Sequence, residues 1–382
     1  MGKYDQVDDV LETLDAIDHP ISKTLKVLVS ICSYAGTGNV LQIQSLLQMC
    51  TIKAEEPEDE EDEDEDEIDT KMEGVEATDA EATGAAAPDA EAAKAKKEDK
   101  EESESKKEDD DDEDQKEDQT YQGYAVLGLG LIAMGEEIGQ EMALRHFDHL
   151  MHYGTPLIKR AVPLAMGLVS ASSAQMKVYE TLSRYSHDQD MDVAYNAIFG
   201  MGLVGAGTNN ARLAQLLRQL ASYYVNDKNG LFTSRIAQGL IHLGKGTLSL
   251  NPFSIDKQIL SKVSLASLLT VSIAMLDPTS FILDQNSNLL YYLAPAIKAR
   301  MLVTVDEDLK PLKVNVRVGQ AVDVVGQAGK PKTITGWVTH STPVLLGYGE
   351  RAELENDEYL PLASSLEGIV ILKKNPDFVD VE

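Results

Sequence analysis

Apolar positions recur at helical spacing over most of the chain and change to a spacing of two near residue 301. Residues 186–220 illustrate the helical part. A polar run from Ser186 to Asp192 supplies N-cap candidates for a helix that we expect to continue to about Gly205, and residues 207–210 (GTNN) form a turn. A second helix is indicated by leucines at i, i+3, i+4 and i+7, namely Leu213, Leu216, Leu217 and Leu220. The pattern therefore predicts a unit of two helices.

One segment of this unit recurs along the chain with a Gly-Leu-(Ile/Val) centre. Four copies begin at Gly128, Ala165, Gly200 and Ala237, so that successive copies start 37, 35 and 37 residues apart. A period of this length with two helices per unit is typical of an α-solenoid, in which each apolar face is buried by the neighbouring units. The sequence therefore predicts a mainly α fold built from two-helix repeats.

A weaker fifth copy precedes these four. Residues 35–39 (AGTGN) correspond to residues 206–210, which places the start of this copy at Val29, 99 residues before Gly128. Removing the 64 residues 55–118 leaves a spacing of 35 residues, so we expect that segment to be an insertion within the array. It holds 33 Asp or Glu and 8 Lys, a net charge of −25 out of −30 for the whole chain. Such a composition predicts a disordered acidic loop, either a solvated spacer or a docking segment for basic partners.

Residues 200–205 (GMGLVG) match the dinucleotide fingerprint G-x-G-x-x-G. That motif needs a preceding strand and an acidic residue about 20 positions further on, whereas here the preceding residues are helix-like and the next carboxylate is Asp227. Glycine inside a helix costs about 1 kcal/mol relative to alanine, so its repeated use implies a compensating gain. We interpret these glycines as packing residues that let neighbouring helices approach closely, with bulkier leucine-rich helices outside.

The C-terminal region changes period after residue 300. Helical patterns extend over residues 254–276 and 288–299, and alternating or short apolar runs then predict a small β-rich module. We expect strands at residues 313–318, 321–325, 333–338, 343–348 and 368–372. The chain is thus divided into residues 1–54 (first repeats, incomplete at the N-terminus), 55–118 (acidic insertion), 119–300 (repeat solenoid and closing helices) and 301–382 (β-rich module).

No pattern of residues indicates catalysis, a cofactor or a metal ion. The segment 326–333 (GQAGKPKT) is similar to a phosphate-binding loop but has the wrong spacing and precedes a strand. His146, His149 and His152 are spaced along one helix without the further ligands that a metal site requires. We expect them to be partly exposed helix residues.

Cysteine content and hydropathy bear on the compartment. Cys32 and Cys50 are the two cysteines, both in apolar helical contexts, which favours a reducing environment over a disulfide framework. The most apolar stretch, residues 259–276, contains a lysine and four serines and is expected to be a buried helix and not a membrane span.

Several stretches resemble the proteasome/cyclosome-repeat scaffolds of the proteasome regulatory particle. They are GYAVLG at 123–128, AMGEE at 133–137, GAGTNNARLA at 205–214, HLGKGT at 242–247, VRVGQAV at 316–322 continuing through GQAGKPKTITG at 326–336, GERAEL at 349–354 and ILKKNP at 371–376. The resemblance implies a toroid-forming α-solenoid in the base of the regulatory particle, present in cytoplasm and nucleus and without enzymatic activity. It also implies ATPase-ring subunits, other regulatory-particle subunits, ubiquitin, ubiquitin-like shuttle factors and a deubiquitinase as partners, with no nucleic acid or membrane.

The resemblance covers the chain apart from the acidic insertion, but members of the family are more than twice as long. This sequence begins within a repeat, so we expect a C-terminal fragment, an alternative product or an incomplete gene product. In the family, the residues that grip ubiquitin-like folds lie in upstream repeats, and we therefore assign no receptor residues here. The alternative function from another class is a free-standing acidic chaperone for basic proteins, which depends on residues 55–118 alone.

Overall fold

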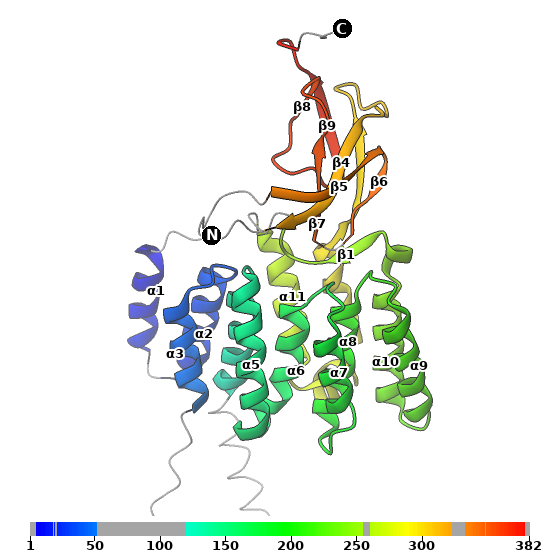
Figure 1. Cartoon of the computed structure of the whole chain (residues 1–382). Coiled ribbons are helices and arrows are strands. Elements are labelled where there is room, and N and C mark those ends of the chain that lie inside the picture. The colour runs from blue at the N-terminus through cyan, green and yellow to red at the C-terminus, as the bar shows by residue number, and fades with distance from the viewer. Residues whose placement is uncertain are drawn as a thin grey trace, which may run out of the picture. The chain divides into compact units, whose positions relative to one another are not determined.

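The computed structural model describes residues 5–17, 19, 21–51, 120–254, 260–322, 333–347 and 349–378. The expected acidic loop at residues 55–118 and most of the phosphate-loop-like segment lie outside these residues. The described chain begins with paired helices and ends in strands (Figure 1).

The helical part consists of antiparallel helices that are joined by short turns, except where residues 52–119 separate α3 from the next helix. Its elements are α1 (Asp5–Asp15), α2 (Ile21–Tyr34), α3 (Val40–Thr51), an unlabelled helix at residues 120–133, α5 (Glu137–Tyr153), α6 (Pro156–Val169), α7 (Met176–Tyr185), α8 (Met191–Gly205), α9 (Ala211–Tyr223) and α10 (Lys228–Ile241). The predicted helix pair is confirmed as α8 and α9, with the turn at residues 206–210 between them.

The helices form an inner and an outer row. In the inner row, α6 packs against α8 and α8 against α10, whereas α7 and α9 lie outside and pack against this row. Almost every residue of α8 is buried, but α9 buries only one face, through residues such as Leu213, Leu217 and Leu220. A helix that is covered on all sides has apolar residues on every face, as α8 does, and one that is covered on a single side is amphipathic, as α9 is.

Small residues allow the inner helices to approach closely. A Cβ atom added to Gly167 of α6 would lie 2.9 Å from the Cα atom of Gly200 in α8. One added to Gly202 of α8 would lie 2.9 Å from the Cα atom of Ala237 in α10. Because these neighbours are backbone atoms, they cannot move aside as a side chain could. The interpretation of the glycines as packing residues is confirmed.

Backbone hydrogen bonds also join consecutive repeats. The amide of Ser172, in the turn after α6, donates to the carbonyl oxygen of Leu203 in α8 at 3.0 Å, and the Gly207 amide donates to Leu240 in α10 at 2.9 Å. Gly36 makes the equivalent bond to Leu131 at 2.9 Å. The last carbonyl groups of a helix lack partners within that helix. Here the turn of one repeat supplies partners to the next.

Further helices, beginning with the short 3₁₀-helix η1 (Leu243–Gly246), and a two-stranded sheet follow α10. The helix α11 (Lys262–Ala274) is buried, as expected, and no helix among the described residues is long and apolar enough to span a membrane. The π-helix η2 (Pro278–Ile282) and the 3₁₀-helix η3 (Ser287–Ala296) come next. The strands β1 (Leu248–Leu250) and β2 (Ile297–Ala299) pair antiparallel.

The helix expected over residues 288–299 was wrong in type and extent. The segment forms a 3₁₀-helix that ends at Ala296, directly after Pro295, which has no amide hydrogen to donate and disfavours a continuing helix. Residues 297–299 then pair with β1 as a strand. Pairing with a segment about 50 residues earlier is a tertiary effect that local periodicity does not report.

The predicted β-rich module is confirmed as two sheets. One has the order β6-β3-β9-β8, and the other has the order β5-β4-β7. The strands are β3 (Met301–Val305), β4 (Asn315–Val322), β5 (Thr333–Ser341), β6 (Val344–Leu345), β7 (Glu350–Leu354), β8 (Tyr359–Pro361) and β9 (Ile369–Lys374). We did not expect β3, β7 and β8 as separate strands: β3 and β8 are short, and β7 (ERAEL) is mostly charged. The two strands expected at residues 313–318 and 321–325 are instead the single strand β4. A small apolar core, including Leu302, Val316 and Val370, fills the module.

Candidate interaction surface

The exposed side of α10 forms an apolar groove. The groove has a volume of about 580 Å³ and lies between α10 and the 3₁₀-helix η3. Its lining includes Phe232, Ile236 and Gly239 from α10, with Leu290 and Tyr291 from η3. Phe232 is 39% exposed and Tyr291 is 83% exposed. Large apolar side chains on a concave surface are typical of a site that binds another apolar surface.

Gly239 relates this groove to the repeat pattern. It occupies the same position in its repeat as Gly130, Gly167 and Gly202, each of which lies against the backbone of the next inner helix. A Cβ atom added to Gly239 would meet nothing within 4 Å. In the earlier repeats, this side of the inner helix is covered by the inner helix of the next repeat. On α10 the same side is open at Gly239.

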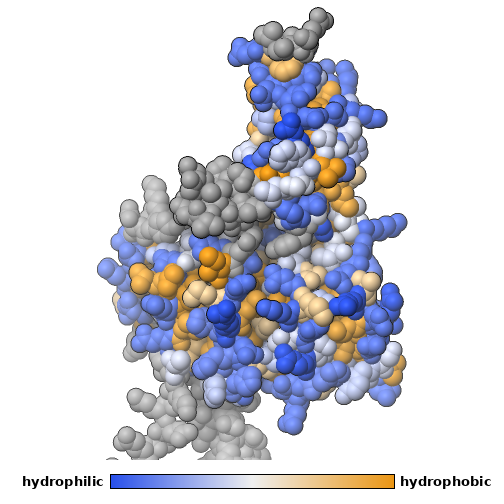
Figure 2. Space-filling model, viewed as in Figure 1, coloured by the Kyte–Doolittle hydropathy of each residue, from blue (hydrophilic) through white to orange (hydrophobic). Residues whose placement is uncertain are grey.

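Other exposed apolar side chains are more scattered. Leu41 at the start of α3 is 74% exposed, and Ile138 at the start of α5 is 76% exposed. On the face shown in Figure 2, apolar side chains form separate patches among charged ones. The groove at α10 is thus distinguished by its concave form, and not by exposure alone.

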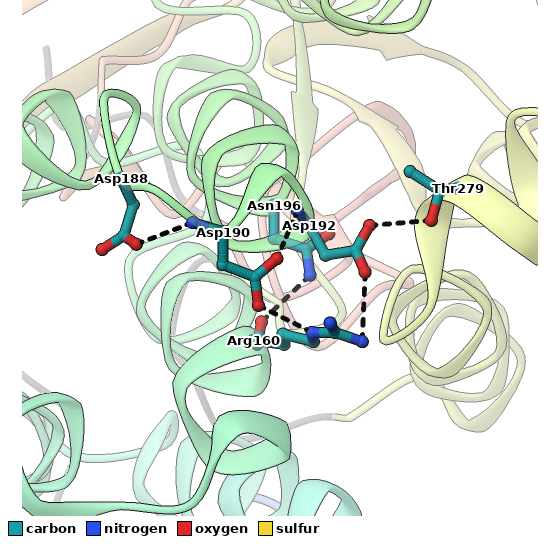
Figure 3. A network of polar contacts seen from close by, with 6 residues as sticks. All are labelled: Arg160, Asp188, Asp190, Asp192, Asn196 and Thr279. Atoms are coloured by element: carbon teal, nitrogen blue, oxygen red, sulfur yellow. Dashed lines mark hydrogen bonds and ion pairs between the residues drawn. The ribbon is translucent and has the colours of Figure 1, made fainter. Parts of the chain in front are cut away.

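A charged network fixes the start of α8 against its neighbours (Figure 3). Arg160 of α6 donates from Nε to Asp190 Oδ2 at 2.9 Å and forms an ion pair from Nη1 to Asp192 Oδ2 at 3.0 Å. Asp190 is also the N-cap of α8, and Thr279 of η2 donates to the other Asp192 oxygen at 2.9 Å. These contacts hold α6, α8 and η2 together.

Burial shapes the electrostatics of this network. Asp192 is 7% exposed, and its burial raises the pKa of its carboxyl group, while Arg160 and the Thr279 hydroxyl oppose that rise. Asn196, fully buried beside it, donates to the Arg160 carbonyl oxygen at 3.0 Å. The contacts of Arg160, Thr279 and Asn196 each join one helix to another, so we interpret the network as one that holds α8 in place against α6 and η2.

The residues singled out in the sequence are dispersed over the helical part. Residues 200–205 lie inside α8 and are buried, with no strand leading into them. His146, His149 and His152 lie on α5, where the His149 ring packs 4.8 Å from that of Tyr153. No cluster of three metal-ligating side chains occurs among the described residues. Cys32 is exposed and Cys50 is buried, and both are free thiols.

The groove at α10 was missed in the sequence. Gly239 could have indicated it, because this residue has the same repeat position as Gly130, Gly167 and Gly202, which pack against the next helix. A glycine at this position therefore predicts one more close contact with a helix. The aromatic residues of η3 gave no comparable signal.

Comparisons with known proteins agree with the repeat structure. Residues 196–229, which include most of α8 and all of α9, match the family model of the proteasome/cyclosome repeat. Residues 325–378 match the model of the 26S proteasome non-ATPase regulatory subunit RPN1 C-terminal region. The chain is 57% identical over 377 residues to the 26S proteasome regulatory subunit rpn-1 of Neurospora crassa, which covers 99% of this chain. The chain belongs to the Rpn1 family.

Further Rpn1 relatives match over the same extent. The 26S proteasome regulatory subunit rpn1 of Schizosaccharomyces pombe is 53% identical over 380 residues, which is all of this chain. The 26S proteasome non-ATPase regulatory subunit 2 homolog A of Arabidopsis thaliana is 44% identical over 378 residues. This chain covers 36% of each of these three relatives and corresponds to their C-terminal part.

Proposed function

We propose that the chain acts as a non-catalytic scaffold section of the proteasome regulatory particle base. In this role it supports ubiquitin-dependent degradation by holding ATPase-ring subunits and receptors for ubiquitin and ubiquitin-like proteins, in both cytoplasm and nucleus. The observation that carries the proposal is the match to Rpn1 proteins over 99% of the chain, together with the repeat packing. A deubiquitinase and shuttle factors would be held by upstream repeats of a longer chain.

The groove between α10 and η3 is the surface that we assign to this scaffolding role. Its floor is a glycine with open space, so it suits a helix that presents a small residue at the crossing point. Within the chain, Gly202 meets Ala237 in this way. We propose that a further repeat helix of the scaffold binds there, as a toroid-forming solenoid requires.

Affinity purification tests the proposal. The tagged chain is expressed in cells, and co-purifying proteins are identified by mass spectrometry for the unchanged chain, Gly239→Phe and Gly239→Ala. The unchanged chain and Gly239→Ala are expected to recover proteasomal ATPases and scaffold proteins. Gly239→Phe fills open space in the isolated chain, so it should fold normally but recover these partners poorly. A folded, monodisperse chain that recovers no proteasome subunit would contradict the proposal.

Deleting residues 55–118 separates the scaffold from the acidic chaperone. Proteasome association should persist in the deletion variant because the repeats on either side of the insertion pack on each other. For example, Gly128 lies against Ile31. Loss of all partners on deletion would favour the chaperone.

A further inference from the structure

Three segments that are far apart in the sequence meet at a second, polar pocket. It has a volume of about 400 Å³ and is lined by Ser173, Ala174, Gln175, Thr208 and Arg300. The first three residues belong to the turn between α6 and α7, Thr208 to the turn between α8 and α9, and Arg300 to the link between β2 and β3. None of the five lining residues is acidic.

Arg300 brings a positive charge to the pocket. Its guanidinium donates from Nη1 to the Gly207 carbonyl oxygen and from Nε to that of Leu346, both at 3.1 Å. Within the described part of the chain it forms no ion pair, and burial lowers its pKa. The carboxylate of Glu350 raises that pKa from a distance but itself accepts a hydrogen bond from the Gly347 amide at 2.6 Å. A guanidinium has five N–H donors, so donors remain for a ligand.

Ser173 adds a hydroxyl group to the lining of the pocket. The residue is 4% exposed, and its hydroxyl has no hydrogen-bond partner among the residues that the structure describes. Its neighbour Ser172 differs, because its hydroxyl accepts from the Leu250 amide at 2.7 Å. Because Ser173 lines the pocket, its hydroxyl is available to donate to or accept from a ligand there.

The helix α7 begins at the same pocket. Its N-cap residue, Gln175, makes no side-chain capping bond, and the first turn contains no acidic residue. The first amides of a helix lack partners within it and carry a partial positive charge, which favours anions. The pocket therefore combines a cation and a hydroxyl group, and it lies next to the N-terminus of α7.

We propose that this pocket binds a tetrahedral oxyanion of phosphate size, held by Arg300 and Ser173 beside the positively polarised N-terminus of α7. The volume accommodates either free phosphate with water molecules or a phosphomonoester whose organic part lies towards solvent. The bound anion contacts the turns within two consecutive repeats and the link that leads into β3, so it stabilises the junction between the solenoid and the β-rich module. This inference does not depend on the proposed scaffold function.

Calorimetric titration with inorganic phosphate at constant ionic strength tests the assignment. The purified chain is compared with Ser173→Ala, Arg300→Met and, as a matched control, Arg218→Met on the exposed face of α9. We expect saturable binding, weakened about fivefold in Ser173→Ala, because one hydrogen bond of about 1 kcal/mol corresponds to that factor. Arg300→Met should weaken it at least about tenfold, as expected for a charge-assisted contact, and Arg218→Met should leave it unchanged.

Ser173→Ala keeps the test decisive if Arg300→Met fails to fold, since the Ser173 hydroxyl has no hydrogen-bond partner among the described residues. The absence of saturable binding, or equal affinities in Ser173→Ala and Arg218→Met, would overturn the proposal. A parallel titration with glycerol phosphate identifies the source of the anion. Tighter binding than inorganic phosphate indicates a phosphomonoester, and weaker binding indicates the free anion.

Discussion

Alanine substitution at two glycines in the same repeat position should change stability in opposite directions. Gly202 of α8 and Gly239 of α10 are both inside helices, so replacing either by alanine gains about 1 kcal/mol of helix propensity. The new Cβ atom at position 202 would lie 2.9 Å from the Cα atom and 3.0 Å from the Cβ atom of Ala237. At position 239 it would meet nothing within 4 Å.

The difference between the two variants isolates the packing cost. Carbon atoms pack best about 3.5–4.0 Å apart, so α8 and α10 would have to separate by several tenths of an ångström. Overpacking of this kind costs about 1–3 kcal/mol. We therefore expect Gly202→Ala to be less stable than Gly239→Ala by about 1–3 kcal/mol, with Gly239→Ala more stable than the unchanged chain.

Urea unfolding followed by circular dichroism measures this difference, provided that both variants keep the slope of the unchanged chain. Both substitutions are the same chemical change in the same fold, so unfolded-state effects largely cancel. Equal destabilisation by the two substitutions would refute the argument that the glycines act through close helix contact.

Three further predictions concern contacts between and within the helices. Arg160→Met should lower the free energy of unfolding by about 1–3 kcal/mol at pH 7, because it leaves the buried Asp192 carboxylate without its cation. Burial raises the pKa of Asp192, so the folded chain binds a proton at this carboxylate more readily than the unfolded chain does. Acidification should therefore recover part of the stability lost in Arg160→Met. Urea unfolding at pH 7 and pH 5 tests both statements, and an equal loss of stability at the two pH values contradicts the second. Cys32 is exposed and should react with iodoacetamide in the folded chain. Cys50 is buried, which raises its pKa to about 12, so it should react only after unfolding. Mass spectrometry distinguishes the two sites, and equal reaction rates in the folded chain contradict the assigned burial. Asn210→Ala should cost about 1 kcal/mol in thermal or urea unfolding, because the Asn210 carbonyl oxygen caps the Arg212 and Leu213 amides of α9, and an unchanged stability would show that the cap contributes nothing.

The two-helix repeat could be predicted because each unit carries its own local signals. The leucines of α9 and the polar residues before α8 mark those helices, and the glycine-centred segment sets the period. The direction of close packing also followed from sequence, since a glycine repeated inside helices needs a packing gain to offset its helix penalty.

The sites could not be predicted in the same way because they depend on contacts between distant residues. Arg300 reaches Gly207 across 93 positions, and Ser173 lies in a turn that resembles the other turns of the array. The strand at residues 297–299 likewise exists because β1 is available to pair with it. Charge and periodicity describe local preference, and neither reports which turns the solenoid brings together.

The central claim is that this chain performs the part of the corresponding region in a proteasome regulatory scaffold. A chimera tests this claim. In the chimera, this chain replaces the matching stretch of the Schizosaccharomyces pombe relative, and native gel electrophoresis follows the incorporation of the chimera into proteasome particles. We expect incorporation of the chimera at a level close to that of the unchanged relative, and loss of incorporation when the chimera carries Gly239→Phe. A folded chimera that stays outside the particles would contradict the claim.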